Sequence, residues 1–267
     1  MDSLPQELID TIIDNLSLSS LLSCSLVAKK WRRRSQQRAF DTISFSSEGE
    51  VNRWCTDIPQ DPDGISSYVR FASFYNIHSW DEPALFGRVL KNLTLLEVLW
   101  VFETRIPDEL QGPISRGEFG REIAILELAS SYCALTTMLS LILSLSKLEG
   151  LIIGNHEITS EGPLPTHPVT PQRGPLDILW LGGDVGGVGE ALAQSRFISS
   201  NLYLDTHIAG IEQLIVLSSD TLVDLKLSSR RFDHPERQLG AKRDIGQFVL
   251  NRSRFPTRAL SRVFFTS

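Results

Sequence analysis

The chain has 267 residues, of which 42% are hydrophobic and 22% are charged. These fractions are close to the averages of folded globular proteins, so they exclude collagen-like and wholly disordered chains. With 26 Lys and Arg against 32 Asp and Glu, the net charge is −6. The sequence therefore has no overall basic field that would favour nucleic acid or an anionic membrane, and we expect neither as a partner.

The Cys and His residues indicate no metal or disulfide framework. Cys24, Cys55 and Cys133 form no C-x-x-C pair, and the five His are scattered. No basic region precedes an apolar run at the N-terminus, so a secretory signal is not expected. We expect a reducing compartment, cytoplasmic or nuclear, and neither a cofactor nor a metal.

One uncharged segment, residues 128–146, is long enough to be considered as a membrane span. Seven of its residues are Ser or Thr, and hydroxyl side chains alternate at helical spacing with Leu135, Met138 and Ile142. We therefore predict an amphipathic helix whose hydroxyl side faces water.

The first 45 residues predict two or three short helices. Residues 4–16 carry a wide apolar stripe, and Asp2 or Ser3 is expected to start that helix. A Ser-rich break separates it from a second apolar segment, which runs into a basic cluster at 29–38. We interpret the basic cluster as a solvated face rather than a phosphate site. So few helices cannot hide so much apolar surface among themselves.

The order of these residues resembles the F-box family. Leu4-Pro5 begins the match, Leu26-Val27 continues it and Trp31-Arg32 ends it, at the family's spacing. The resemblance implies that residues 1–45 dock onto the Skp family adaptor of an SCF ubiquitin ligase, and through it onto a cullin scaffold. By position, the adaptor-facing and core surfaces would be formed by Leu4, Pro5, Leu8, Ile9, Ile12, Leu16, Leu21, Leu22, Leu26 and Val27. The simpler alternative is that this helical unit only packs against the rest of the chain.

Residues 46–229 show a recurring pattern with apolar residues at positions 1, 4 and 6. Its starts are at 66, 96, 123, 148, 176, 199 and 222, and the two weaker units at 66 and 199 lack only the first apolar residue. Spacings of 23 to 30 residues are typical of leucine-rich repeats. Helical stretches are expected between the strand patterns, at 83–92, 134–146, 188–197 and 208–219.

This region resembles the degenerate leucine-rich repeats that follow many F-boxes. It departs from them at the ninth position, where a regular repeat has Asn or Cys and this chain has Thr104, Ser131, His156, Asp184 and His207. We predict an α/β fold in which an N-terminal helical F-box is followed by an irregular leucine-rich-repeat solenoid of strand–helix units. An ordinary α/β domain is the alternative.

Position 5 of each repeat is expected to face away from the core, because side chains alternate along a strand. In chain order it holds Arg70, Trp100, Glu127, Ile152, Trp180, Tyr203 and Lys226. Trp100, Ile152, Trp180 and Tyr203 are candidates for binding the protein target, because large aromatic side chains dominate protein interfaces. Alternatively, the Pro-rich segment 159–175, expected to be a loop, or the C-terminal tail covers this row.

Two further segments complete the sequence. The Gly-rich turn at 182–189 has the spacing of neither G-x-G-x-x-G nor a P-loop, so we interpret it as a repeat turn. Residues 230–267 have nine Lys or Arg against three acids and no repeat, so we expect a basic tail, irregular or truncated. We expect a substrate receptor that is not an enzyme. A non-ligase interaction scaffold and a small α/β enzyme are the alternatives.

Overall fold

A computed structural model describes residues 4–27, 29–58, 64–115, 120–159, 174–205 and 207–228. All of them belong to one unit, Met1–Arg231. Most of the Pro-rich segment and the whole basic tail lie outside these residues. The fold is mixed α/β, with a helical region at the N-terminus and a parallel sheet after it.

The helical region consists of α1 (Gln6–Asp14), α2 (Leu18–Val27) and α3 (Lys29–Ala39). It has a small core of its own, made by Ile9, Ile13 and Leu21, with Leu16 and Trp31 packed against it. Helix α1 begins at Gln6, and Pro5 is its N-cap, with an extended ψ of 145°. The expectation that Asp2 or Ser3 starts this helix is therefore wrong, because the chain is still extended at Pro5.

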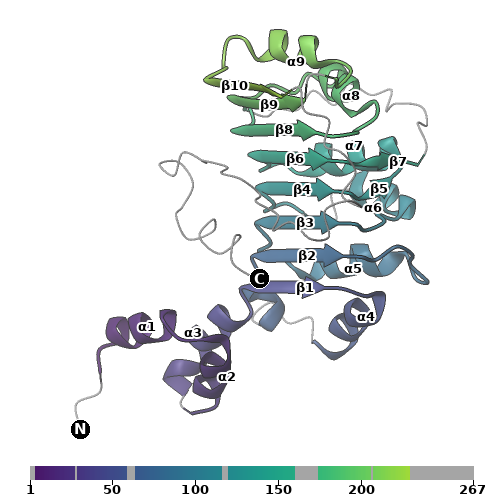
Figure 1. Ribbon diagram of the computed structural model, residues 1–267. Coiled ribbons are helices and arrows are strands. Elements are labelled where there is room, and N and C mark those ends of the chain that lie inside the picture. The colour runs from purple at the N-terminus through teal and green to yellow at the C-terminus, as the bar shows by residue number, and fades with distance from the viewer. Residues whose placement is uncertain are drawn as a thin grey trace, which may run out of the picture. The chain divides into compact units, whose positions relative to one another are not determined.

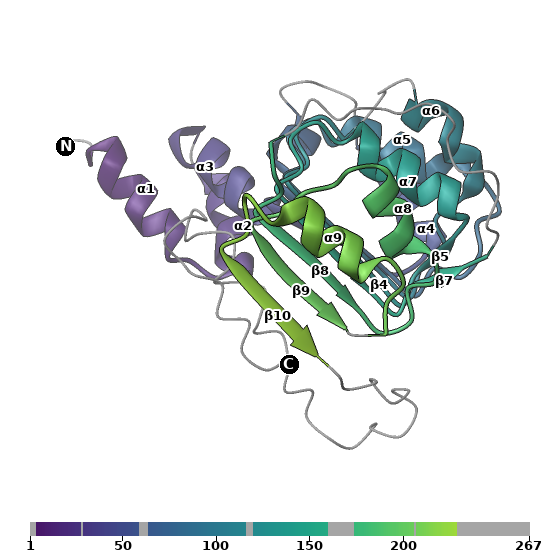
Figure 2. The ribbon, with the colours of Figure 1, turned by 90° about the horizontal axis from the view of Figure 1, so that it is seen from above.

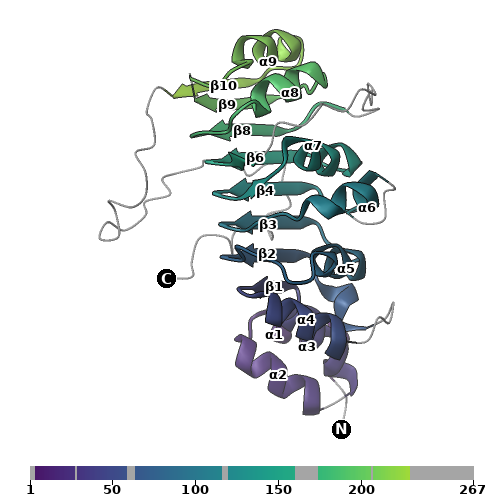
Figure 3. The ribbon, with the colours of Figure 1, turned by 90° about the vertical axis from the view of Figure 1, so that its right-hand side faces the viewer.

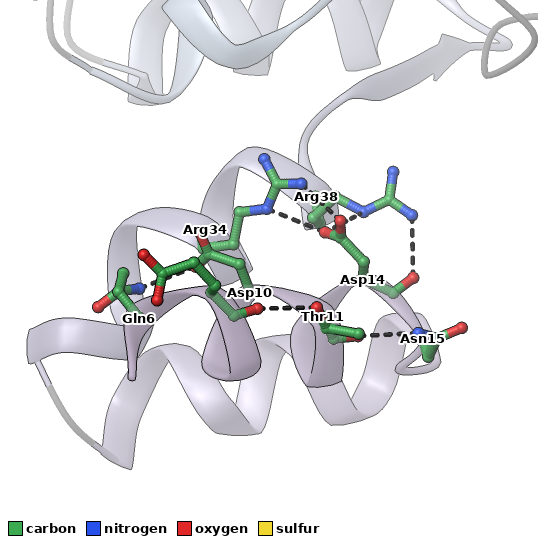
Figure 4. Close-up of polar contacts among 8 residues, drawn as sticks. Gln6, Asp10, Thr11, Asp14, Asn15, Arg34 and Arg38 are labelled. Atoms are coloured by element: carbon green, nitrogen blue, oxygen red, sulfur yellow. Dashed lines mark hydrogen bonds and ion pairs between the residues drawn. The ribbon is translucent and has the colours of Figure 1, made fainter. Parts of the chain in front are cut away.

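Ion pairing joins α1 to α3 (Figure 4). Arg34 donates two hydrogen bonds to the carboxylate of Asp14, of 2.9 Å from Nε and 2.6 Å from the second nitrogen. Arg38 approaches the same carboxylate at 3.4 Å and donates to the Asp14 carbonyl at 3.2 Å. Part of the basic cluster thus serves the packing of the helices, which differs from the solvated face that we expected.

A parallel sheet of eight strands makes up most of the remaining structure (Figure 1). The strands follow one another in the order β1 (Thr42–Phe45), β2 (Phe71–Tyr75), β3 (Val98–Phe102), β4 (Ile125–Ala129), β6 (Gly150–Gly154), β8 (Ile178–Gly182), β9 (Asn201–Asp205) and β10 (Asp224–Ser228). Two short strands, β5 (Tyr132–Cys133) and β7 (Glu157–Ile158), pair beside it. Neighbours in the chain are neighbours in the sheet, so each strand adds to the same edge.

Helices lie between successive strands of the sheet, except that the described residues include none between β6 and β8. They are α4 (Glu48–Asp57), α5 (Ala84–Asn92), α6 (Gln111–Ser115), α7 (Leu135–Ser144), α8 (Val188–Gln194) and α9 (Ile211–Ser218), with short 3-10 turns η1 (Ile65–Tyr68) and η2 (Asp108–Leu110). The helical stretches expected at 83–92, 134–146, 188–197 and 208–219 are confirmed as α5, α7, α8 and α9. Figures 2 and 3 show α5–α9 on one face of the sheet, which leaves the opposite face without any of them. We call that opposite face the open face.

The main core lies between the sheet and these helices. Leu99 and Val101 of β3 are fully buried there, as are Leu126 and Leu128 of β4. The matching residues of the last described strand, Leu225 and Leu227, are 38% and 52% exposed. Strand alternation therefore sends positions 4 and 6 of the repeat pattern into the core, as the sequence predicts, up to this last strand.

The first repeat is shifted relative to the prediction. Strand β2 aligns Ala72 with Leu99 and Phe74 with Val101, so Val69 and Phe71 do not hold positions 4 and 6. Ser73 therefore lies beside Trp100 in place of Arg70. Val69 is buried, but it precedes the strand, and apolar spacing alone does not distinguish these two frames.

The uncharged segment at 128–146 is divided between a strand and a helix. Leu128 lies in β4, and only Leu135–Ser144 is helical. Thr137 is fully buried and its hydroxyl donates to Asp108 Oδ1 at 3.1 Å, so the prediction that the hydroxyl side faces water fails at this residue. Among the described residues, no helix is long and apolar enough to cross a membrane.

Candidate protein-interaction surfaces

The helical region exposes a large amount of apolar side chain. Seven such residues form what we call the helical apolar surface: Leu4, Leu8, Ile12, Leu18, Leu22, Leu26 and Val27. Their exposure runs from 45% at Ile12 and Leu22 to 82% at Leu26. Exposed apolar residues in such number on so small a unit are typical of a protein-binding surface.

Helical periodicity explains which residues face outward. Leu8 and Ile12 are four residues apart on α1, and Leu18, Leu22 and Leu26 are spaced in the same way on α2, so each set lies along one face of its helix.

The structure divides the candidate set that the sequence left undivided. Ile9 and Leu21 are 4% exposed and belong to the core, and Leu16 packs against them. Pro5 is exposed at the start of α1. Leu18, at 59% exposure, is absent from the sequence-based set, although its four-residue spacing from Leu22 would have identified it.

The second surface is on the open face of the sheet. The strand register places Trp100, Glu127, Ile152, Trp180 and Tyr203 side by side on five successive strands. We call these five residues the aromatic row. All five are half-buried, and Lys226 continues the row on β10. Except for the first repeat, the predicted alignment of position 5 is confirmed.

Ring contacts stabilise Trp100 and Tyr203 at the two ends of the row, and a further stacked pair lies on β2 and β3. Trp100 stacks on Phe71 with ring centroids 6.1 Å apart, and Tyr75 stacks on Phe102 at 5.1 Å. The Lys226 ammonium lies over the Tyr203 ring, 4.9 Å from the ring centroid. Contacts of this kind stabilise the ring positions before any partner arrives.

Glu127 is the only acid in the aromatic row. Its neighbours at the same level are Trp100 on β3 and Ile152 on β6, neither of which has a charge. Burial raises the pKa of the Glu127 carboxyl to about 7, because the charged form loses contact with water. Burial therefore favours the protonated form of this carboxyl more than at an exposed Glu.

Buried polar groups at the carboxyl ends of the strands support the backbone. The Thr104 hydroxyl accepts from the Ile77 amide at 3.3 Å and donates to the Phe102 carbonyl at 2.7 Å. Ser131 Oγ lies 2.8 Å from His156 Nδ1. These three ninth-position residues are at most 1% exposed and form hydrogen bonds inside the fold, whereas Asp184 and His207 at the same position are exposed.

Cys133 and His156 lie close together but are not arranged for catalysis. Cys133 Sγ is 3.5 Å from His156 Nε2, and both residues are 1% exposed. Burial raises the pKa of the Cys133 thiol far above its usual range and lowers the pKa of His156 to about 4. Neither a thiolate nor an imidazolium is favoured here, so this pair is inert at neutral pH.

The Gly-rich turn uses its polar groups within the protein. The Gly183 amide donates to Asp205 Oδ2 at 2.7 Å, and the Gly186 amide donates to Asp184 Oδ1 at 3.2 Å. Helix α8, which follows, has only seven residues. Within the described ranges, no group of three or more His, Cys, Asp or Glu is placed to hold a metal ion.

The comparison with protein families identifies the helical region. Residues 1–42 match the family model of the F-box domain, which implies binding to a Skp-type adaptor. This match ends where the sheet begins, at β1. A search among curated proteins finds no sequence similar to this chain.

Proposed function

We propose that this protein is a substrate receptor of an SCF-type ubiquitin ligase. In this proposal, the helical apolar surface binds the Skp family adaptor, which links the chain to a cullin scaffold. The open face of the sheet binds a protein target. The observation that carries the proposal is that an F-box domain at residues 1–42 leaves seven apolar side chains exposed while its own core is already filled.

Adaptor binding is favourable because it removes these side chains from water. Burial of a Leu or Ile side chain contributes about 1.5 to 3 kcal/mol, and Leu26 and Val27 are almost fully available for it. Only part of that energy appears as affinity, since association has its own entropic cost.

We further propose that residues 46–229 are degenerate leucine-rich repeats. The residues at position 4, in register from Ile43 of β1 to Leu225 of β10, recur every 23 to 29 residues. A left-handed turn also recurs at the end of β2, β3, β4 and β6, where Asn76, Glu103, Ser130 and Asn155 have φ between 47° and 57°. A backbone feature repeated in this way supports a repeat architecture even where the residue types differ.

Target binding is assigned to the aromatic row. Trp and Tyr are the residues most often found as binding hot spots, and four large apolar side chains on one sheet face resemble the centre of an interface. The candidates remain Trp100, Ile152, Trp180 and Tyr203.

The adaptor assignment is tested by calorimetry of the full chain with a purified Skp family adaptor. Leu26→Ala should weaken binding about tenfold, or about 1.4 kcal/mol. Val223→Ala is the matched control, because Val223 is 78% exposed on the sheet domain and Leu26 is 82% exposed. No binding by the unaltered chain would contradict the adaptor role and favour a scaffold outside the ligase. Unchanged affinity of the Leu26 variant would contradict the assignment of the helical apolar surface as the binding site.

A further inference from the structure

A single carboxylate without a partner lies in the middle of the aromatic row. Among the described residues, no hydrogen bond or ion pair involves the Glu127 carboxylate, and burial is the sole cause of its shifted pKa. Two other acids of residues 46–229 do have a cation beside them: Glu97 lies 3.5 Å from Arg70, and Glu122 pairs with Lys147. Burying a carboxylate without a cation costs free energy, so this position is suited to a cation from outside the described chain.

The end of the row shows how this surface holds a cation. The Lys226 ammonium lies 4.9 Å above the Tyr203 ring and 3.7 Å from a carboxylate oxygen of Asp224. An aromatic face and a carboxylate thus hold one ammonium between them. Trp100 and Glu127 provide the same two groups on β3 and β4, without the ammonium.

The charge of the sheet domain favours a basic partner. Residues 46–229 have 24 Asp and Glu against 11 Lys and Arg. A negative field of this size attracts positively charged segments, whereas the aromatic row alone would attract any apolar segment. Charge complementarity therefore favours a basic segment over a neutral or acidic one on the open face.

We propose that the target presents an Arg or Lys side chain to Glu127, with its aliphatic stem packed between Trp100 and Ile152. This inference rests on the proposed target-binding function of the same row. The partner is a protein segment, because Trp180 and Tyr203 extend the apolar row beyond the reach of one side chain. Trp180 lies two strands from Glu127, which is about 10 Å at the spacing of a sheet. An extended peptide covers that distance in about three residues.

The experiment uses synthetic nonapeptides with a fixed central residue and mixed flanking residues, so that four residues on each side reach past Trp180. The central residue is Arg, Lys, uncharged citrulline or Glu. Each pool is tested for binding to the full chain by fluorescence anisotropy. We expect the Arg and Lys pools to bind at least tenfold more tightly than the citrulline pool. Comparison of Arg with Lys shows which cation is preferred.

Three variants separate a local contact from a general charge effect. Glu127→Gln should abolish the preference for basic peptides, and Glu127→Lys should reverse it in favour of the Glu pool. Glu149→Gln is the control, because Glu149 is an exposed acid of the same domain outside the aromatic row, and it should keep the preference. An equal preference in the unaltered chain and in Glu127→Gln would overturn the proposal.

The remaining outcomes distinguish this inference from the function on which it rests. If Trp180→Ala abolishes binding but no pool is preferred, the row binds protein segments and the inference about the cation is wrong. If no pool binds, or if Trp180→Ala changes nothing, the target-binding function fails and the inference fails with it. Displacement of a basic pool by spermidine at equal concentration would indicate a site for free cations and would also overturn it.

Discussion

The indole ring of Trp180 lies against the backbone of Gly182, so close that a Cβ atom on Gly182 would be 2.5 Å from the ring. The same ring approaches Gly154 on the neighbouring strand, where a Cβ atom would be 2.7 Å away. Trp180 therefore extends across the carboxyl ends of β6 and β8, over two residues without side chains. Its position in the aromatic row depends on both glycines.

Gly182→Ala should displace the Trp180 ring and weaken target binding. The new methyl group overlaps the indole, and overpacking of this kind typically costs about 1 to 3 kcal/mol. Near-ultraviolet circular dichroism would detect the displaced indole ring, and thermal unfolding would measure the loss of stability. Gly187→Ala is the control, because its Cβ would be 3.9 Å from the nearest side chain and its φ of −78° suits any residue. Equal spectra for the two variants would contradict the assigned ring position.

Leu8 and Ile9 are adjacent residues with different expected roles. Leu8 is 51% exposed and Ile9 is 4% exposed. Leu8→Ala should reduce adaptor affinity and change the free energy of unfolding by less than about 0.5 kcal/mol. Ile9→Ala should destabilise the helical region by about 2 to 5 kcal/mol, because it leaves a cavity. Calorimetry with the adaptor measures the affinity, and chemical denaturation measures the free energy of unfolding. A larger loss of stability in Leu8→Ala than in Ile9→Ala would mean that Leu8 belongs to the core.

Asp14→Ala should loosen α1 from α3, because Arg34 and Arg38 both lose their shared carboxylate. The side chains of Asp14 and Arg34 are 26% and 30% exposed. We therefore expect the free energy of unfolding to fall by about 1 kcal/mol, which is less than the loss expected for a fully buried ion pair. Salt should reduce the difference between the variant and the unaltered chain. Denaturation at low salt and in 1 M NaCl would measure this, and a difference that persists in high salt would argue against an electrostatic origin.

The pKa values of Glu127 and His156 predict opposite effects of pH on stability. The pKa of Glu127 rises from 4.5 to about 7 on folding, so folding retains its proton and stability falls as the pH rises through that range. The pKa of His156 falls from 6.5 to about 4, so the unfolded chain holds the extra proton and stability rises with pH over nearly the same range. The two contributions therefore offset each other.

Glu127→Gln should reveal the contribution of His156. Between pH 4.5 and 6.5, the stability of this variant should rise more steeply with pH than that of the unaltered chain, by up to about 1.4 kcal/mol per pH unit. The partial solvent contact of Glu127 makes the measured difference smaller. Urea denaturation at a series of pH values would test this, and parallel curves for the two proteins would show that Glu127 does not titrate in this range.

Local patterns in the sequence determined the secondary structure and the order of the strands. Apolar spacing identified α5, α7, α8 and α9, and strand alternation placed Trp100, Ile152, Trp180 and Tyr203 on the face opposite the core. The Leu-Pro start, the Leu-Val pair and the Trp-Arg end together indicated the F-box, because that module depends on residues close together in the chain. These features are local, so they can be read without knowledge of the fold.

Tertiary structure decided that Ile9 packs in the core of the helical region while its neighbour Leu8 is exposed, because the two residues have similar hydrophobic character and differ in what packs on them. It also decided the register of the first unit of the predicted pattern, where Val69 and Ala72 are alternatives for position 4 and pairing with β3 selects Ala72. The environment of Glu127 depends on two strands that are 27 and 25 residues away in sequence. Neighbours brought together only by strand pairing change its pKa, and no local pattern contains that information.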